Sequence, residues 1–219
     1  QAATFGAPKR IAGTAAADVE PPQLSVSGTN AYIVWHEFES SSSTASEVYF
    51  SRSTNSGASY SSRANLSNSA GVASSEEQIF SSGTNVFVVY TEDDGVQKKV
   101  YFRRSVNSGA SFSTRKLLSD ANAPSNPRVT ASGANVVVAW QNQGSGGSQD
   151  IYVRQSTDTG ANFGPGANVT NNSSTSEFYF QDGGGLRQLA IIGSKVIITW
   201  RDSAVAGAGL ETFVIQGTL

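Results

Sequence analysis

The 219-residue chain contains no cysteine, no methionine and a single histidine, His36. The absence of cysteine excludes disulfides, thiolate metal sites and thiol catalysis, and one histidine cannot form a histidine-based metal site. Charge is scarce and balanced, because 15 Lys and Arg residues stand against 17 Asp and Glu residues. That balance excludes a dedicated nucleic-acid binder, and no apolar run approaches the length of a membrane span.

The chain begins at Gln1 and shows no apolar core of a signal peptide. We therefore expect an exported protein, located outside the cell or at its surface, whose signal sequence has already been removed. Four Asn-X-Ser/Thr sequons agree with export and are candidate N-glycosylation sites. They are Asn65, Asn168, Asn171 and Asn172.

What is present is an internal repeat of 50 to 60 residues. Four similar apolar segments end in a glycine, and seven residues after each glycine stands a large aromatic that we expect to pack between repeats. These aromatics are Trp35, Tyr90, Trp140 and Trp200. The alternating, β-branched stretches around them predict strands, and each repeat continues into a third and a fourth strand. We expect four antiparallel four-stranded units, at about 21–75, 76–125, 126–176 and 177–219 with 1–20.

The two ends of the chain fit the same period. When they are joined, Gly217 and Phe5 stand seven positions apart, which is the spacing of Ser53 and Tyr60 in the first repeat. This match predicts that the N-terminal strand completes the last unit. Because a closed ring of sheets leaves no unpaired edge, the sequence predicts an all-β fold: a four-bladed β-propeller forming one domain over residues 1–219.

The pattern S-x-(D/N)-x-G-x-x-(F/Y) occurs three times and resembles the Asp-box repeat of sialidases and other β-propellers. Its twelve positions are Ser53, Asn55, Gly57, Tyr60, Ser105, Asn107, Gly109, Phe112, Ser156, Asp158, Gly160 and Phe163. The resemblance implies a structural turn at the periphery of each blade, between its third and fourth strands. The residue types suit a tight turn, because Ser and Asn or Asp bond nearby backbone groups and glycine accepts a positive φ.

The resemblance also implies what a sialidase would need: an arginine cluster, a Tyr nucleophile paired with a Glu, and an Asp acid/base, usually on six blades. Only Pro127-Arg128-Val129 echoes the arginine motif in this chain. The sequence therefore favours a non-catalytic extracellular or cell-surface protein with a structural or adhesion role over an enzyme. Two alternatives stay open, a glycan-binding lectin and a sialidase-like glycoside hydrolase.

Glycans and further copies of the same chain are the expected partners. The N-terminal strand could complete the last sheet of a neighbouring copy as well as its own. We expect no cofactor, with calcium as the one alternative. Its candidate ligands stand two residues after the repeated aromatics: Glu37, Glu92, Asn142 and Asp202. Clustered oxygens would suit a hard cation, whereas solvated strand ends or local hydrogen bonds are the other interpretation. His36 precedes Glu37 on the same strand, so their side chains should face opposite ways.

Overall fold

The computed structural model describes residues 4, 6–12, 18–120, 123–143, 148–171, 174–178, 188–202 and 211–219. These residues form sixteen β-strands and no helix. Within them there is accordingly no helix of the length and apolarity needed to cross a membrane. The predicted all-β class is confirmed.

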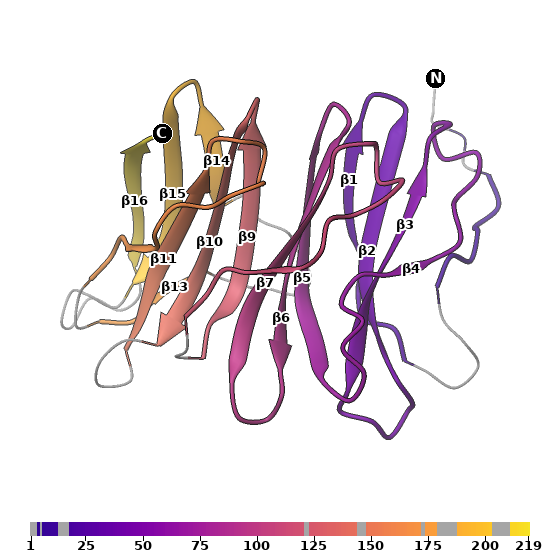
Figure 1. Cartoon of the computed structure of the whole chain (residues 1–219), viewed down its shortest axis with the longest axis horizontal. Helices are drawn as coiled ribbons and strands as arrows, with labels where there is room; N and C mark the ends of the chain where they lie inside the picture. The colour runs from indigo at the N-terminus through magenta and orange to yellow at the C-terminus, as the bar shows by residue number, and fades with distance from the viewer. Residues whose placement is uncertain are drawn as a thin grey trace.

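The strands form one eight-stranded sheet and two four-stranded sheets. The eight-stranded sheet consists of two antiparallel units that a single parallel bridge joins, between Ser46 and Ala73, so that four antiparallel units follow one another along the chain (Figure 1). Unit 1 contains β1 (Gln23–Ser27), β2 (Asn30–Phe38), β3 (Ser46–Ser53) and β4 (Ala64–Asn65). Unit 2 contains β5 (Ala73–Ser82), β6 (Asn85–Asp93), β7 (Lys98–Ser105) and β8 (Lys116–Leu117). Unit 3 contains β9 (Ser125–Ser132), β10 (Asn135–Gln143), β11 (Gln149–Ser156) and β12 (Ala167–Asn168). Unit 4 contains β13 (Ser176–Glu177), β14 (Leu189–Ile192), β15 (Lys195–Asp202) and β16 (Glu211–Thr218).

The repeated glycines make the hairpin between the first two long strands of each unit. Gly28, Gly83, Gly133 and Gly193 all have φ between 57° and 59°, a conformation that costs glycine little and other residues more. The strands on either side pair directly, as Ser27 with Asn30 and Ser82 with Asn85. The glycine positions therefore fix the register of each hairpin.

The core lies between neighbouring units and not inside each one. One face of unit 1, with Tyr32, Val34 and Phe50, packs against Val86, Val88 and Tyr90 of unit 2. The same arrangement recurs between units 2 and 3 and between units 3 and 4. The repeated aromatics Trp35, Tyr90, Trp140 and Trp200 are all buried. Each unit thus buries its alternating apolar side chains by stacking against the next.

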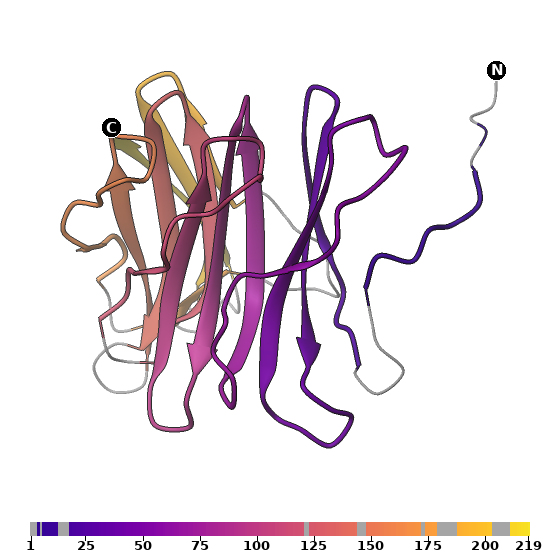
Figure 2. The same ribbon diagram turned by 45° about the vertical axis from the view of Figure 1, so that its right-hand side comes forward.

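The four units form an open row, and the prediction of a ring closed by the N-terminal strand is wrong. Residues 6–12 and the C-terminal strand β16 lie on opposite sides of the molecule in both views (Figures 1 and 2). Phe5 lies outside the described residues, but Gly6, Ala7 and Ile11 line a hollow together with Ile33 of unit 1. Nearby, the Lys9 ammonium donates to the Ala58 carbonyl. The spacing along the chain indicates that the N-terminal segment has the pattern of a strand of such a unit. It does not indicate whether the segment lies beside the first or the last unit of the row.

Candidate functional site

A cavity of about 350 Å³ lies along the innermost strands of all four units. Its walls come from β1, β5, β9 and β14. The four residues at equivalent positions in the repeats are three glutamines and one arginine: Gln23, Gln78, Arg128 and Gln188. Aliphatic side chains follow them, including Leu24, Ile79, Val129 and Leu189. The cavity therefore combines amides and one guanidinium with apolar walls, and its size falls in the range of small-ligand pockets.

Arg128 is buried, with an exposed fraction of 6%, and hydrogen bonds fix its guanidinium. Its Nη1 donates to the carbonyls of Asn126 and Pro127, at 3.3 and 3.1 Å. Its Nη2 donates to Gln188 Oε1 of the neighbouring unit at 3.3 Å. The guanidinium carbon lies 5.3 Å from the centre of the Phe178 ring, a cation–π geometry.

The same burial lowers the pKa of Arg128 to about 10, and the negative charge of Glu76 partly opposes that effect. The guanidinium therefore stays cationic at neutral pH. A fixed, poorly hydrated cation at a cavity wall is suited to binding a carboxylate, because the cost of its desolvation has already been met during folding.

A backbone irregularity at the start of β5 separates two adjacent carboxylates. The pairing of β5 with β6 shifts between Ser75 and Gln78, and Glu76 adopts φ 57°. Glu76 then accepts hydrogen bonds from the Lys98 ammonium and from the backbone N–H of Asn126 at 2.7 Å. Glu77 turns the other way, toward unit 1. Such β-bulges re-aim side chains next to functional sites.

Glu77 meets the single histidine of the chain across the boundary between units 1 and 2. Its Oε2 lies 2.9 Å from His36 Nδ1, and the side chains are 4% and 15% exposed. His36 lies two residues beyond Val34, which pairs with cavity residue Gln23, and Glu77 directly precedes cavity residue Gln78. The pair therefore lies near the end of β1 and β5 that carries Gln23 and Gln78, beside the residues that line the cavity and not among them. A carboxylate–imidazole pair can accept and deliver a proton.

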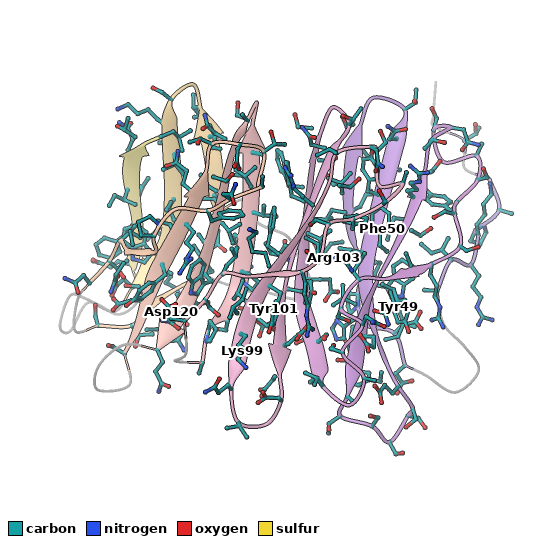
Figure 3. All side chains as sticks on the ribbon, viewed as in Figure 1. Tyr49, Phe50, Lys99, Tyr101, Arg103 and Asp120 are labelled. Carbon is teal, nitrogen blue, oxygen red and sulfur yellow. The ribbon has the colours of Figure 1, made fainter. Side chains whose placement is uncertain are left out.

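Three of the four positions predicted as a ring of cation ligands, Glu37, Glu92 and Asp202, accept hydrogen bonds inside their own unit. Glu37 accepts from Trp35 Nε1 at 2.8 Å and from Arg63. Glu92 accepts from Arg115 Nη1 at 2.6 and 2.8 Å. These arginines lie over the rings of Tyr49 and Tyr101, which occupy equivalent places on β3 and β7 (Figure 3).

Units 3 and 4 vary the same arrangement. Asp202 accepts from Ser174 and Ser176, at 2.6 Å each, and from Trp200 Nε1 at 3.2 Å. Asn142 replaces the acid in unit 3, and its Oδ1 is buried without a hydrogen-bond partner among the described residues, as is Trp140 Nε1. Across the described ranges no group of three or more His, Asp or Glu side chains could hold a metal ion. At three of these four repeated positions, the sequence pattern thus corresponds to hydrogen bonds within the unit.

Each of the three Asp-box-like turns contains the same set of hydrogen bonds. Ser53 Oγ donates to Asn55 Oδ1 at 2.9 Å and accepts from the Gly57 N–H at 2.9 Å. The turns at Ser105, Asn107 and Gly109 and at Ser156, Asp158 and Gly160 repeat these bonds. In the third turn, bonds from Asn162 and Ser156 lower the pKa of the Asp158 carboxyl.

Each turn of units 2 and 3 contacts the preceding unit. Phe112 packs edge-on against Phe50 of unit 1, with 4.8 Å between the ring centres. Phe163 packs in the same way against Phe102 of unit 2, with 4.9 Å between the ring centres. Figure 3 marks Phe50 on β3. Arg52 Nη1 donates to the Ser108 carbonyl at 2.6 Å, and Arg104 Nη1 does so to that of Thr159 at 3.0 Å. These contacts join neighbouring units. Tyr60 of the first turn instead lines the hollow beside residues 6–11.

The sequons differ in their surroundings. Asn65 lies on β4, and its Oδ1 accepts from the Asn68 N–H at 2.8 Å. Asn168 Nδ2 is engaged, because it donates to Asp150 Oδ2 at 2.9 Å and to the Tyr152 hydroxyl at 3.3 Å. Asn171 is exposed, and Asn172 lies outside the described residues. Asn171 is therefore the most exposed of the three described sequon asparagines.

Comparison with known proteins places the fold. No protein-family model and no curated protein sequence matches this chain. Among solved structures, an alpha-L-arabinanase of Penicillium chrysogenum superposes with a TM-score of 0.59 at 11% identity, over 91% of this chain and 62% of that one. An alpha-L-arabinofuranosidase of Fusarium graminearum superposes with a TM-score of 0.56 at 8% identity, over 90% and 61%. A sialidase of Trypanosoma rangeli superposes with a TM-score of 0.50 at 14% identity, over 84% and 34%.

These similarities define the fold as that of sialidase-like and arabinanase-like β-propellers. The chain spans about three fifths of the arabinanase and about a third of the sialidase. The prediction of a non-catalytic structural or adhesion module is wrong, because an arabinanase, an arabinofuranosidase and a sialidase share the fold. A repeat pattern reveals how sheets stack, and the chemistry of a propeller resides in a few side chains that need no common spacing.

Proposed function

We propose that the protein acts on carbohydrate, as a glycoside-hydrolase-type β-propeller that binds a glycan in the cavity of the innermost strands. The observation that carries this proposal is the cavity itself. Equivalent positions of four repeats place Gln23, Gln78, Arg128 and Gln188 at one hollow, in a fold shared with an arabinanase and a sialidase. Amides bind sugar hydroxyls as both donors and acceptors, and the aliphatic walls suit the apolar face of a sugar ring.

We further propose that the four units are blades of such a propeller and that the three turns are Asp boxes. The hydrogen bonds repeated at Ser53, Ser105 and Ser156 support the second point. We place the protein outside the cell, as its sequons suggested, with Asn171 as the preferred glycosylation site.

Within the cavity, Arg128 would bind the most negative part of the ligand. The sequence around it resembles the arginine motif of sialidases, and its guanidinium is already fixed by Gln188 and two backbone carbonyls. A bidentate contact with a sugar carboxylate needs a fixed, planar guanidinium of this kind. The proposal thus favours an acidic sugar over a neutral one.

The His36–Glu77 pair would supply the proton transfer that cleavage of a glycosidic bond requires. Glu77 would orient the imidazole, and His36, the more exposed partner, would exchange the proton with the ligand. Glu76 would hold the bulge in place through Lys98 and Asn126. Replacing His36 with Asn should leave glycan binding within about twofold and should remove hydrolysis, because only the proton-transfer step is affected.

The test measures binding by titration calorimetry and cleavage by release of reducing ends, with sialyllactose and arabinan oligosaccharides as probes. Arg128→Gln introduces the residue that the other three repeats carry, so it removes the charge with little change of shape. We expect it to weaken binding of an acidic sugar roughly 10- to 100-fold, as for loss of a charged hydrogen bond. Lys195→Ala, which removes an exposed cation bonded to Thr218, is the matched control. Equal binding by wild type and Arg128→Gln would refute the cavity assignment.

A further inference from the structure

The two outer faces of the row expose aliphatic side chains that the inner faces bury. On unit 1, the face turned away from unit 2 carries Leu24 and Val26, which are 64% and 62% exposed. Ile33 lies beside Leu24 across the strand pair. We call this surface the leading face. On unit 4, the face turned away from unit 3 carries Ile192 and Val214, which are 68% and 67% exposed. We call that surface the trailing face.

Each of these faces is one half of an interface that the chain builds three times. The residues of units 2, 3 and 4 that correspond to Ile33 are Val88, Val138 and Ile198, and all three are buried against the preceding unit. The residues of units 1 and 2 that correspond to Val214 are Phe50 and Phe102, and both are buried against the following unit. The leading face therefore corresponds to the side of units 2, 3 and 4 that packs against the preceding unit. The trailing face corresponds to the side of units 1 and 2 that packs against the following unit.

The chain does not bring these two faces together. They lie at opposite ends of the row (Figure 1). The N-terminal residues 6–11 reach Ile33, Gly57 and Tyr60, and they leave Leu24 and Val26 exposed. Exposed aliphatic side chains at the ends of an otherwise repeated interface mark a binding surface for a partner with the matching face.

We propose that the leading face of one copy binds the trailing face of a second copy, so that unit 1 stacks on unit 4 as units 2, 3 and 4 stack on their predecessors. The contact joins two different surfaces, so it is heterologous. Repetition of such a contact produces a closed ring where the rotation allows it and an open chain of copies otherwise. Leu24 and Val26 also line the cavity, so association is measured without any glycan, and its failure would leave the proposed glycan binding within one copy untouched.

Sedimentation velocity of the full chain tests the proposal, over about 1 to 500 µM, the range of moderate protein–protein affinities. The variants are Leu24→Glu on the leading face and Val214→Glu on the trailing face. Both positions are exposed, so the monomer should fold, and circular dichroism verifies this. Val96→Glu is the matched control, because Val96 is 88% exposed on the turn after β6.

We expect the wild type and Val96→Glu to associate with rising concentration, and each single-face variant to stay monomeric alone. An equimolar mixture of Leu24→Glu and Val214→Glu should form a complex of two chains, since each supplies the face that the other has lost. Three results would overturn the proposal: a monomeric wild type throughout the range, unchanged association of Val214→Glu alone, or loss of association in Val96→Glu. The second result would indicate that two leading faces bind each other.

Discussion

Gly109 lies where the turn of unit 2 approaches unit 1 too closely to leave room for a side chain. A Cβ at this position would lie 2.6 Å from Cζ and 3.0 Å from Cε1 of Phe50, both shorter than van der Waals contact. The ring cannot easily move away, because Phe50 is 2% exposed and packs against Phe112 and Tyr32. Gly109 also has φ 74°, a region that disfavours a side chain. Gly109→Ala therefore combines a conformational cost with a steric one.

The two costs can be separated with a second glycine. The left-handed conformation costs alanine roughly 1–2 kcal/mol, and overpacking of a filled core costs roughly 1–3 kcal/mol. Gly83 has φ 59° and nothing within 4 Å of its notional Cβ, so Gly83→Ala carries only the first cost. We expect Gly109→Ala to lower the melting temperature by roughly 2–12 °C more than Gly83→Ala does, from the usual 2–4 °C per kcal/mol for a chain of this size.

Thermal and urea denaturation followed by circular dichroism provide the assay, and a double-mutant cycle identifies the partner. Phe50→Leu removes the two ring atoms that the new methyl group would meet, so Gly109→Ala should cost less in that background. A coupling of about 1 kcal/mol or more between the two substitutions is expected. The reasoning is refuted if Gly109→Ala is no more destabilising than Gly83→Ala, or if the two substitutions are additive.

Two further predictions concern carboxylates. Asp158→Asn introduces the residue that the other two turns carry at the equivalent positions, Asn55 and Asn107. Hydrogen bonds hold the pKa of Asp158 below its usual value, so the wild-type carboxylate stabilises the fold above about pH 4. That contribution is lost as the pH falls toward the folded-state pKa, so melting temperatures measured from pH 7 to pH 2 should fall more steeply for the wild type, and parallel curves would contradict this. Arg115→Gln removes the cation beside Glu92, whose pKa burial already raises. We expect a loss of about 1–2 kcal/mol at pH 8 that becomes smaller as the pH is lowered, because a protonated Glu92 needs no cation. A loss independent of pH would show that the pair has no electrostatic role.

Much of the fold was predictable because it depends on local chemistry. The glycines at 28, 83, 133 and 193 require a turn conformation that few residues accept, and alternation of apolar residues identifies the strands around them. The buried positions of Trp35, Tyr90, Trp140 and Trp200 follow from the same pattern. These features are read from neighbouring residues, so they need no knowledge of the three-dimensional arrangement.

The candidate site depended on contacts that no spacing encodes. His36 and Glu77 are 41 residues apart and meet only because unit 2 stacks on unit 1. The bulge that turns Glu77 toward unit 1 leaves no distinctive signal among neighbouring polar residues. Arg128 was noticeable as one arginine among three glutamines, yet its burial against Phe178 and Gln188 was not. Closure of the ring failed as a prediction for the same reason, since the period of a repeat does not specify how far an arc curves.

The location of the hydrophobic clusters between units has a consequence for how the molecule comes apart. Among the described residues, each hydrophobic cluster joins two neighbouring units and none is shared by all four, so the free energy of unfolding is close to a sum of unit and nearest-neighbour terms. Units 1 and 4 each have one such neighbour and should exchange their amide hydrogens sooner than units 2 and 3, which have two. Loss of cooperation at the middle boundary would divide the protein into two halves, whereas loss at either end would shed a single unit and leave the remainder folded.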